Sequence, residues 1–249
     1  AFPAKRGQER KLDRLAAERP EEKSASEIGV NRLAQPTVYD LNLIDTPGHV
    51  DFSYEVSRSL QACEGAVLVV DASQGIQAQT LANVYLAMEQ DLAIIPVLNK
   101  VDLPAADVPR VSKQVINLLG CNESDIIHIS AKTGQNVDQV LEAIVERIPA
   151  PTGQPDDPTR ALIFDSYYDD YRGVILYVRL VDGQIKKGEA IRMLATGARG
   201  LALEVGHLSP GMISDPSLDT GEIGYIVTNL KTTREARVGD TVTLQKYFE

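Results

Sequence analysis

Between residues 66 and 148, short apolar runs alternate with segments whose apolar residues recur every three to four positions. Runs of this length, such as Ala66–Val70, Ala93–Leu98 and Ile126–Ile129, are typical of strands buried on both faces. A further strand is expected where Val38, Leu41 and Leu43 lead to Asp45. The intervening segments predict amphipathic helices at residues 52–63, 81–88, 111–119 and 137–148. This alternation predicts an α/β fold, a parallel sheet with helices on both faces.

The pattern changes after a proline-rich segment at residues 149–160, which we interpret as a stiff linker. Beyond it the helical period disappears, and short β-rich runs predict a small antiparallel β-barrel over residues 161–249. Asp182-Gly183 predicts a hairpin turn between two of these runs. His207, close to Pro210 and Gly211, is expected in a loop. Residues 36–148 are then the α/β domain, and residues 1–35 are a charged arm.

Composition excludes some classes of function. The net charge of the 249 residues is −10, which argues against a chain that coats nucleic acid with its whole surface, although a local RNA-binding patch stays possible. Cys63 and Cys121 form no metal-binding pattern and are expected to be free thiols in a reducing compartment. No apolar run is long enough to span a bilayer, so no integral membrane segment is expected.

Polar motifs follow the predicted strands, at the edge where α/β sheets bind ligands. The first is Asp45-Thr46-Pro47-Gly48-His49. A carboxylate at Asp45 can hold Mg²⁺ through a water molecule, and Gly48 lets the backbone N–H approach a γ-phosphate. His49 can orient an attacking water. Taken alone, these residues are also compatible with a tight turn that carries a surface histidine.

Two further motifs are suited to reading guanine. In Asn99-Lys100-Val101-Asp102, the Asp102 carboxylate matches the N1–H and exocyclic amine of guanine, a donor pair that adenine lacks. Asn99 can bridge the base and neighbouring loops, and the aliphatic stem of Lys100 can pack on the base plane. Ser130-Ala131-Lys132 would present backbone N–H groups to the guanine O6. The two motifs together are far more specific than either one alone.

One part of a nucleotide site does not occur in the 249 residues. They contain no G-x-x-x-x-G-K-[ST] sequence, the loop whose backbone N–H groups and lysine hold the phosphates. We therefore expect this chain alone to hydrolyse GTP weakly or not at all. We also expect that the absence of the strand before such a loop exposes an edge of the sheet.

The stretch from Asp45 to Leu60 resembles the translational GTPases, and specifically those of the LepA type, elongation factor 4. The segments Gln77–Thr80, Ala161–Ser166, Tyr171–Val174 and Val238–Thr241 are similar to the same family. The resemblance covers about residues 34 to 249. It implies an incomplete P-loop-NTPase-like G domain, lacking the phosphate loop, followed by a translation-factor-type barrel.

The resemblance also implies ligands, catalytic residues and partners. GTP, GDP and Mg²⁺ would be the ligands, with Asp45 holding Mg²⁺ through a water and His49 as the catalytic residue. Residues 29–35 occupy the place of the first switch region, and Asn31 stands where the family has its Mg²⁺-binding threonine. The implied partners are the ribosome, through rRNA and ribosomal proteins, and tRNA-bearing elongation complexes.

Two functions therefore stay open for this chain on its sequence. The first is a GTP-binding translation factor that hydrolyses GTP on the ribosome in the intact protein. The second is a pseudo-GTPase or fragment that serves as a non-catalytic ribosome-binding module. A bacterial cytoplasmic location is expected, with an organelle matrix or peripheral membrane association as alternatives.

Overall fold

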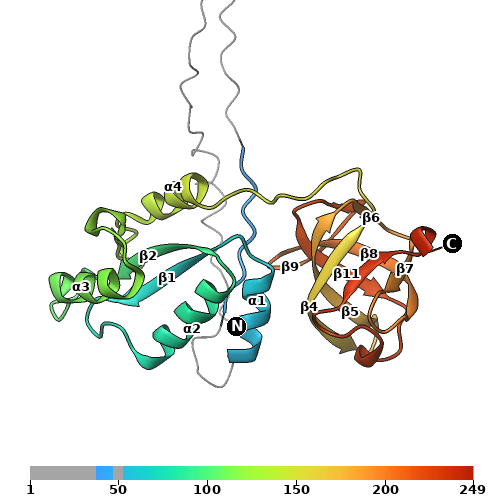
Figure 1. Ribbon diagram of the computed structural model, residues 1–249, viewed down its shortest axis with the longest axis horizontal. Helices are drawn as coiled ribbons and strands as arrows, with labels where there is room; N and C mark the ends of the chain where they lie inside the picture. The colour runs from blue at the N-terminus through green and yellow to red at the C-terminus, as the bar shows by residue number, and fades with distance from the viewer. Residues whose placement is uncertain (1–37, 47–52, 249) are drawn as a thin grey trace, which may run out of the picture. The chain divides into compact units, whose positions relative to one another are not determined.

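The computed structural model describes residues 38–46 and 53–248 (Figure 1). Within them, residues 53–148 contain a parallel sheet whose strand order is β1 (Gly65–Asp71), β2 (Ala93–Asn99) and β3 (Ile127–His128). The helices are α1 (Ser53–Gln61), α2 (Ala78–Glu89), α3 (Val108–Leu119) and α4 (Val137–Arg147), and a 3₁₀ turn, η3 (Glu123–Asp125), precedes β3. The structure thus confirms the strands and helices predicted for residues 52–148. None of the helices in the described ranges is long and apolar enough to cross a membrane.

Helices cover both faces of this sheet because consecutive strand residues point to opposite sides. Leu68 and Val70 of β1 belong to a cluster that includes Val111 and Val115 of α3. Val67 belongs to the cluster under α4, and a further cluster joins α1 and α2 to the side of α3. Figure 1 shows α4 on one side of the sheet and α2 on the other. The predicted parallel sheet with helices on both faces is therefore confirmed.

The strand expected before Asp45 is not formed. Residues 38–46 have no regular secondary structure, and Leu43 is 88% exposed. A strand persists only when its backbone groups pair with a neighbour, and no strand pairing links residues 38–46 to other described residues. Among the described residues β1 pairs only with β2, and Val69 on its α4 side is 55% exposed. This agrees with the expectation of an exposed sheet edge.

The second part of the chain forms a closed antiparallel barrel. Its strands pair in the order β11-β5-β4-β12-β7-β8, and β8 returns to pair with β11. A seventh strand, β9, extends β8 as a hairpin, and β6 and β10 form a separate two-stranded sheet. The bounds are β4 (Arg160–Asp169), β5 (Gly173–Asp182), β6 (Gln184–Lys186), β7 (Ala190–Met193), β8 (Arg199–Ser209), β9 (Gly211–Asp215), β10 (Ser217–Asp219), β11 (Ile223–Thr228) and β12 (Thr241–Leu244), with 3₁₀ turns η4 (Thr233–Glu235) and η5 (Gln245–Phe248).

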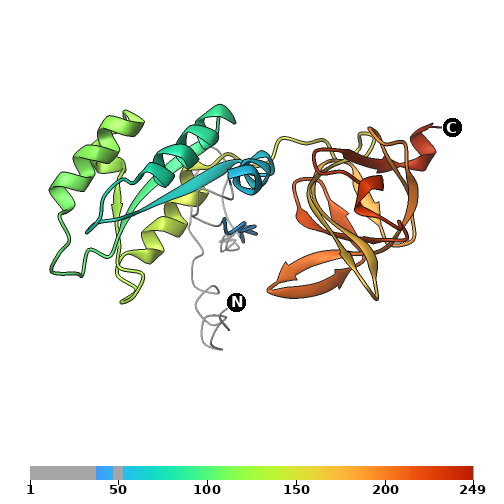
Figure 2. The same ribbon diagram turned by 90° about the horizontal axis from the view of Figure 1, so that it is seen from below.

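The barrel core follows the period of two expected for strands. In β5, Val174, Leu176, Val178 and Leu180 are fully buried and belong to one core cluster. Figure 2 shows the strands of the barrel curving around this interior. The predicted barrel is confirmed, with a core independent of the helix-covered sheet.

Two local predictions in the barrel are wrong. His207 lies in β8, not in a loop, and its Nδ1 is 2.6 Å from Oδ2 of Asp215 in β9. The residue before His207, Gly206, interrupts the apolar pattern that would predict a strand. The structure requires glycine at this position because a Cβ would collide with the Ile213 carbonyl. Asp182-Gly183 does form a turn, with Gly183 at φ +70°. It leads into β6, which pairs with β10, so the turn does not close a hairpin.

Candidate functional site

The carboxyl ends of the three parallel strands bring the predicted guanine-reading loops together. Asp71 at the end of β1 pairs in register with Asn99 at the end of β2, and Leu98 pairs with His128 of β3. Ser130 is the second residue after the end of β3. Residues 99–102 and 130–132 therefore leave the sheet at one edge, which is where sheets of this kind bind ligands.

The Asn99 side chain ties these two loops to each other. Its Oδ1 accepts hydrogen bonds from the backbone N–H of Lys100 at 2.7 Å and from that of Ala131 at 3.0 Å. The backbone N–H of Val101 also donates to the Ile129 carbonyl at 3.3 Å. Residues 32 positions apart in sequence are thus held in a fixed relation before any ligand is considered.

Lys100 is held by an ion pair with Asp71, the last residue of β1. It adopts a left-handed backbone conformation with φ +66°, unusual for a residue with a side chain. Its Nζ lies 2.6 Å from Oδ2 of Asp71. The bond from Lys100 and those from Ser73 keep the pKa of Asp71 well below its usual range.

The carboxylate of Asp102 is the open part of the site. Asp102 is exposed, and no hydrogen bond or ion pair to another described residue occupies its side chain. An ionised carboxylate offers two acceptor oxygens and no donor. Among the described residues both oxygens of Asp102 are therefore available to accept the two donors that guanine presents.

In the Ser130–Lys132 loop, two backbone N–H groups already have partners within the protein. Ser130 is fully buried, and its N–H donates to the Gln135 carbonyl at 3.2 Å. The N–H of Ala131 donates to Asn99, so neither of these two groups points freely at a ligand. Lys132 is exposed. In this conformation Ala131 links the loops, and an O6 contact from this segment stays a prediction.

The phosphate side of the predicted site is described only in part. Asp45 is exposed and Thr46 is half-buried, and no hydrogen bond within the described residues connects either of them to the guanine-reading loops. Pro47, Gly48 and His49, like Asn31, lie outside the described residues. Within residues 38–46 and 53–248, no group of three histidine, cysteine or acidic side chains could hold a metal ion. The single carboxylate of Asp45 fits a Mg²⁺ that is held mainly by water and phosphate.

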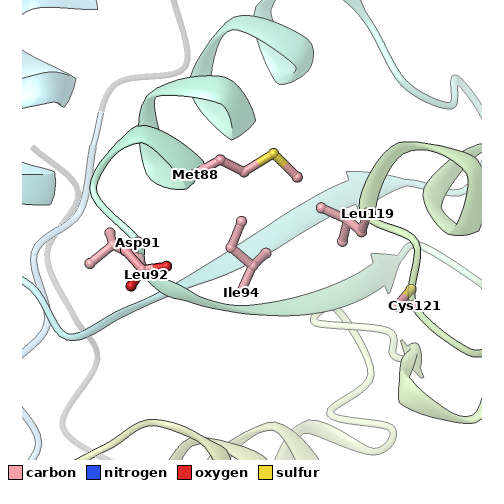
Figure 3. Close-up of a pocket in the computed structure, with 6 residues that line it drawn as sticks. All are labelled: Met88, Asp91, Leu92, Ile94, Leu119 and Cys121. Carbon is pink, nitrogen blue, oxygen red and sulfur yellow. The ribbon is translucent and has the colours of Figure 1, made fainter.

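A hollow of about 390 Å³ lies elsewhere in the same sheet. Figure 3 shows Met88 of α2, Leu119 at the end of α3 and Ile94 of β2 converging on it, with Asp91 and Cys121 at its rim. Ile94 precedes the end of β2 by five residues, which is about 17 Å along a strand. The hollow is therefore near the amino end of the sheet and is separate from the guanine-reading loops.

Comparison with known proteins identifies both parts of the chain. Residues 3–150 match the family model of the elongation factor Tu GTP binding domain, and residues 173–243 match elongation factor Tu domain 2. The chain is 60% identical over 205 residues to elongation factor 4 of Streptomyces coelicolor, covering 82% of this chain and 33% of that protein. It is 58% identical over 207 residues to elongation factor 4 of Dehalococcoides mccartyi strain CBDB1, covering 83% and 34%.

The chain thus spans about a third of the length of these relatives. A solved structure, translation elongation factor SelB from Methanococcus maripaludis in its apo form, has a TM-score of 0.63 at 18% identity, covering 75% of this chain and 41% of that one. At this identity the likeness shows the fold alone, a G domain and a barrel. The resemblance to elongation factor 4 is confirmed by the relatives, and the chain belongs to the elongation factor Tu GTP-binding domain family.

Proposed function

We propose that this chain is the guanine-nucleotide-binding part of a translation factor of the elongation factor 4 type, which hydrolyses GTP while bound to the ribosome. The observation that carries the proposal is the arrangement of Asn99 and Asp102. Asn99 fixes two loops against each other, and the Asp102 carboxylate beside it has no partner among the described residues. The 60% identity to a protein named elongation factor 4, over 82% of this chain, supports the same conclusion.

Guanine selectivity follows from the chemistry of the Asp102 carboxylate. Its oxygens accept hydrogen bonds from the N1–H and exocyclic amine of guanine, and bonds to a charged group contribute about 1.5–3 kcal/mol each. Adenine carries an acceptor at N1, so the carboxylate would face a lone pair and stay unpaired. A site that requires a donor pair rejects a base lacking one by several orders of magnitude.

The phosphate chemistry is proposed for residues around the first motif. Asp45 would hold Mg²⁺ through a water, with Asn31 as a second ligand. The N–H of Gly48 would donate to the γ-phosphate, and His49 would orient the attacking water and stabilise developing charge. Mg²⁺ bound there would neutralise charge on the phosphates. Ribosomal RNA and proteins, with tRNA-bearing elongation complexes, are the proposed partners, in the cytoplasm of a bacterial cell.

The alternative of a non-catalytic ribosome-binding module is not favoured, because residues 3–150 match a GTP-binding domain model. The two readings agree on guanine recognition and differ in hydrolysis. Binding of the base is therefore tested first, independently of the phosphates.

The experiment is a titration of the ¹⁵N-labelled chain with guanosine and, separately, adenosine, followed by NMR. Guanosine should shift the amide signals of Lys100, Asp102 and Ala131 with saturation, and adenosine should leave them unchanged. Asp102→Asn should weaken guanosine binding at least about tenfold, because one acceptor becomes a donor that faces the guanine amine. Asp138→Asn, an equal charge change at an exposed position of α4, is the matched control. Equal shifts with both nucleosides, or none with guanosine in a folded chain, would overturn the proposal.

A further inference from the structure

Asp71 was not singled out by any sequence motif, yet the structure places its carboxylate against Lys100, in the first of the guanine-reading loops. It is the last residue of β1, in register with Asn99 of β2. Its side chain is 18% exposed, and Oδ2 is 2.6 Å from Lys100 Nζ. Lys100 is the first residue after β2. Asp71, at the end of β1, therefore binds the side chain that follows the neighbouring strand.

The carboxylate is itself fixed, so it acts as a rigid anchor. Oδ1 accepts hydrogen bonds from the Ser73 N–H at 2.8 Å and the Ser73 hydroxyl at 2.6 Å. Gln74 Nε2 donates to Oδ2 at 3.1 Å, and the Gly75 N–H donates to the Asp71 carbonyl at 2.8 Å. This turn holds the carboxyl group in one orientation, toward Lys100.

Lysine carries a flexible four-carbon stem with much rotamer freedom. In this chain both ends of the Lys100 side chain are restrained: the backbone at φ +66° with its N–H on Asn99, and the ammonium on Asp71. A stem restrained at both ends is ordered before ligand arrives, so binding does not have to order it.

We propose that Asp71 is a positioning residue for guanine recognition, which acts by holding the stem of Lys100 in the orientation that packs on the base plane. The inference rests on the proposed function, since it concerns the same base-binding loops. It assigns Asp71 a role in nucleotide affinity that operates through Lys100 and not through contact with the ligand.

The variants separate the ion pair from the turn. Asp71→Asn keeps an oxygen for the Ser73 bonds but loses the charge that holds the ammonium. Ser73→Ala is the matched control, because it removes only the hydroxyl bond and keeps both the Ser73 N–H bond that orients the carboxylate and the ion pair. The first readout is the NMR signal of the Lys100 ammonium protons, which a 2.6 Å ion pair protects from solvent exchange. We expect this signal in the parent and in Ser73→Ala, and its loss in Asp71→Asn.

The second readout is the guanosine titration described above. Asp71→Asn should raise the Kd about three- to tenfold, the range expected when one long side chain must be ordered on binding, and Ser73→Ala should leave it unchanged. In a Lys100→Ala background, Asp71→Asn should have no further effect. An unchanged Kd in Asp71→Asn, or an equal loss in the Lys100→Ala background, would overturn the inference. If the parent binds no guanosine, the proposed function fails, and the ammonium signal alone then decides whether Asp71 holds Lys100.

Discussion

Replacing Asn99 by alanine tests the link between the two guanine-reading loops. The substitution removes the oxygen shared by the N–H groups of Lys100, at 2.7 Å, and Ala131, at 3.0 Å. A hydrogen bond of this kind contributes about 0.5–1.5 kcal/mol. Both donors lie in exposed loops where water can replace part of the lost acceptor, so we expect a total loss of about 1–2 kcal/mol. Since 1.4 kcal/mol is a factor of ten in an equilibrium constant, local opening of these loops should become about tenfold more frequent.

Native-state hydrogen exchange measures this opening residue by residue. In Asn99→Ala the amides of Lys100 and Ala131 should exchange about ten times faster than in the parent, while the β2 amides keep their protection. Asn229→Ala is the matched control, because Asn229 Oδ1 accepts a comparable bond, at 2.8 Å, from the N–H of Leu201 in the barrel. It should leave both loop amides unchanged. Identical exchange at Lys100 and Ala131 in Asn99→Ala and in the parent would refute the reasoning.

Three further predictions concern stability and association. A backbone N–H bond and an ion pair lower the pKa of Asp182, so its charge stabilises the barrel above about pH 4, and this contribution is lost as the pH falls through the lowered pKa. The Tm difference between the parent and Asp182→Asn should therefore shrink from about pH 5 to about pH 2. A difference that stays constant with pH would contradict this role of the Asp182 charge. Gly206→Ala should lower the free energy of unfolding, measured by chemical denaturation, by about 1–3 kcal/mol, because the added Cβ would collide with backbone. Gly211→Ala, where a Cβ meets open space, should change it little. Equal losses in the two variants would argue against the packing of β8 at Gly206. Val69→Thr should reduce aggregation, measured by light scattering, with little change in Tm. Val70 is only 2% exposed, so Val70→Thr should lower the Tm. Equal Tm losses in the two variants would show that Val69 is also covered.

The sequence predicted those parts of the fold in which buried and exposed side chains recur at the regular spacing of a strand or a helix. The alternating runs and stripes of residues 66–148 became β1 to β3 and their helices, because a covered sheet needs continuous apolar strands. The expected strand before Asp45 failed since strand formation depends on a partner that a local pattern does not supply. His207 was misplaced because Pro210 and Gly211, which suggested a loop around it, mark only the turn after β8, and the strand continues to Ser209.

The candidate site was predictable to the extent that strand ends identify it. Asn99, Lys100 and Asp102 were predicted as candidates because their motif follows a predicted strand, and the structure brings this motif beside the loop at Ser130. Asp71 was missed because its ion pair with Lys100 joins residues 29 positions apart. Such a contact follows from the register between β1 and β2, which no local signal in either strand reveals.

The pairing of β1 sets the order in which the sheet opens. Among the described residues β1 has one partner strand, whereas β2 has two and is buried from Ile95 to Leu98. Cooperative units with fewer contacts open first, so β1 should detach while β2 is still in place. Asn99 would then stay on β2, the strand with two partners, and Asp71 would leave with β1. Lys100 would keep its backbone position and lose its ion pair with Asp71. Partial unfolding would therefore release the Lys100 side chain before it disrupts the loop at residues 99–102.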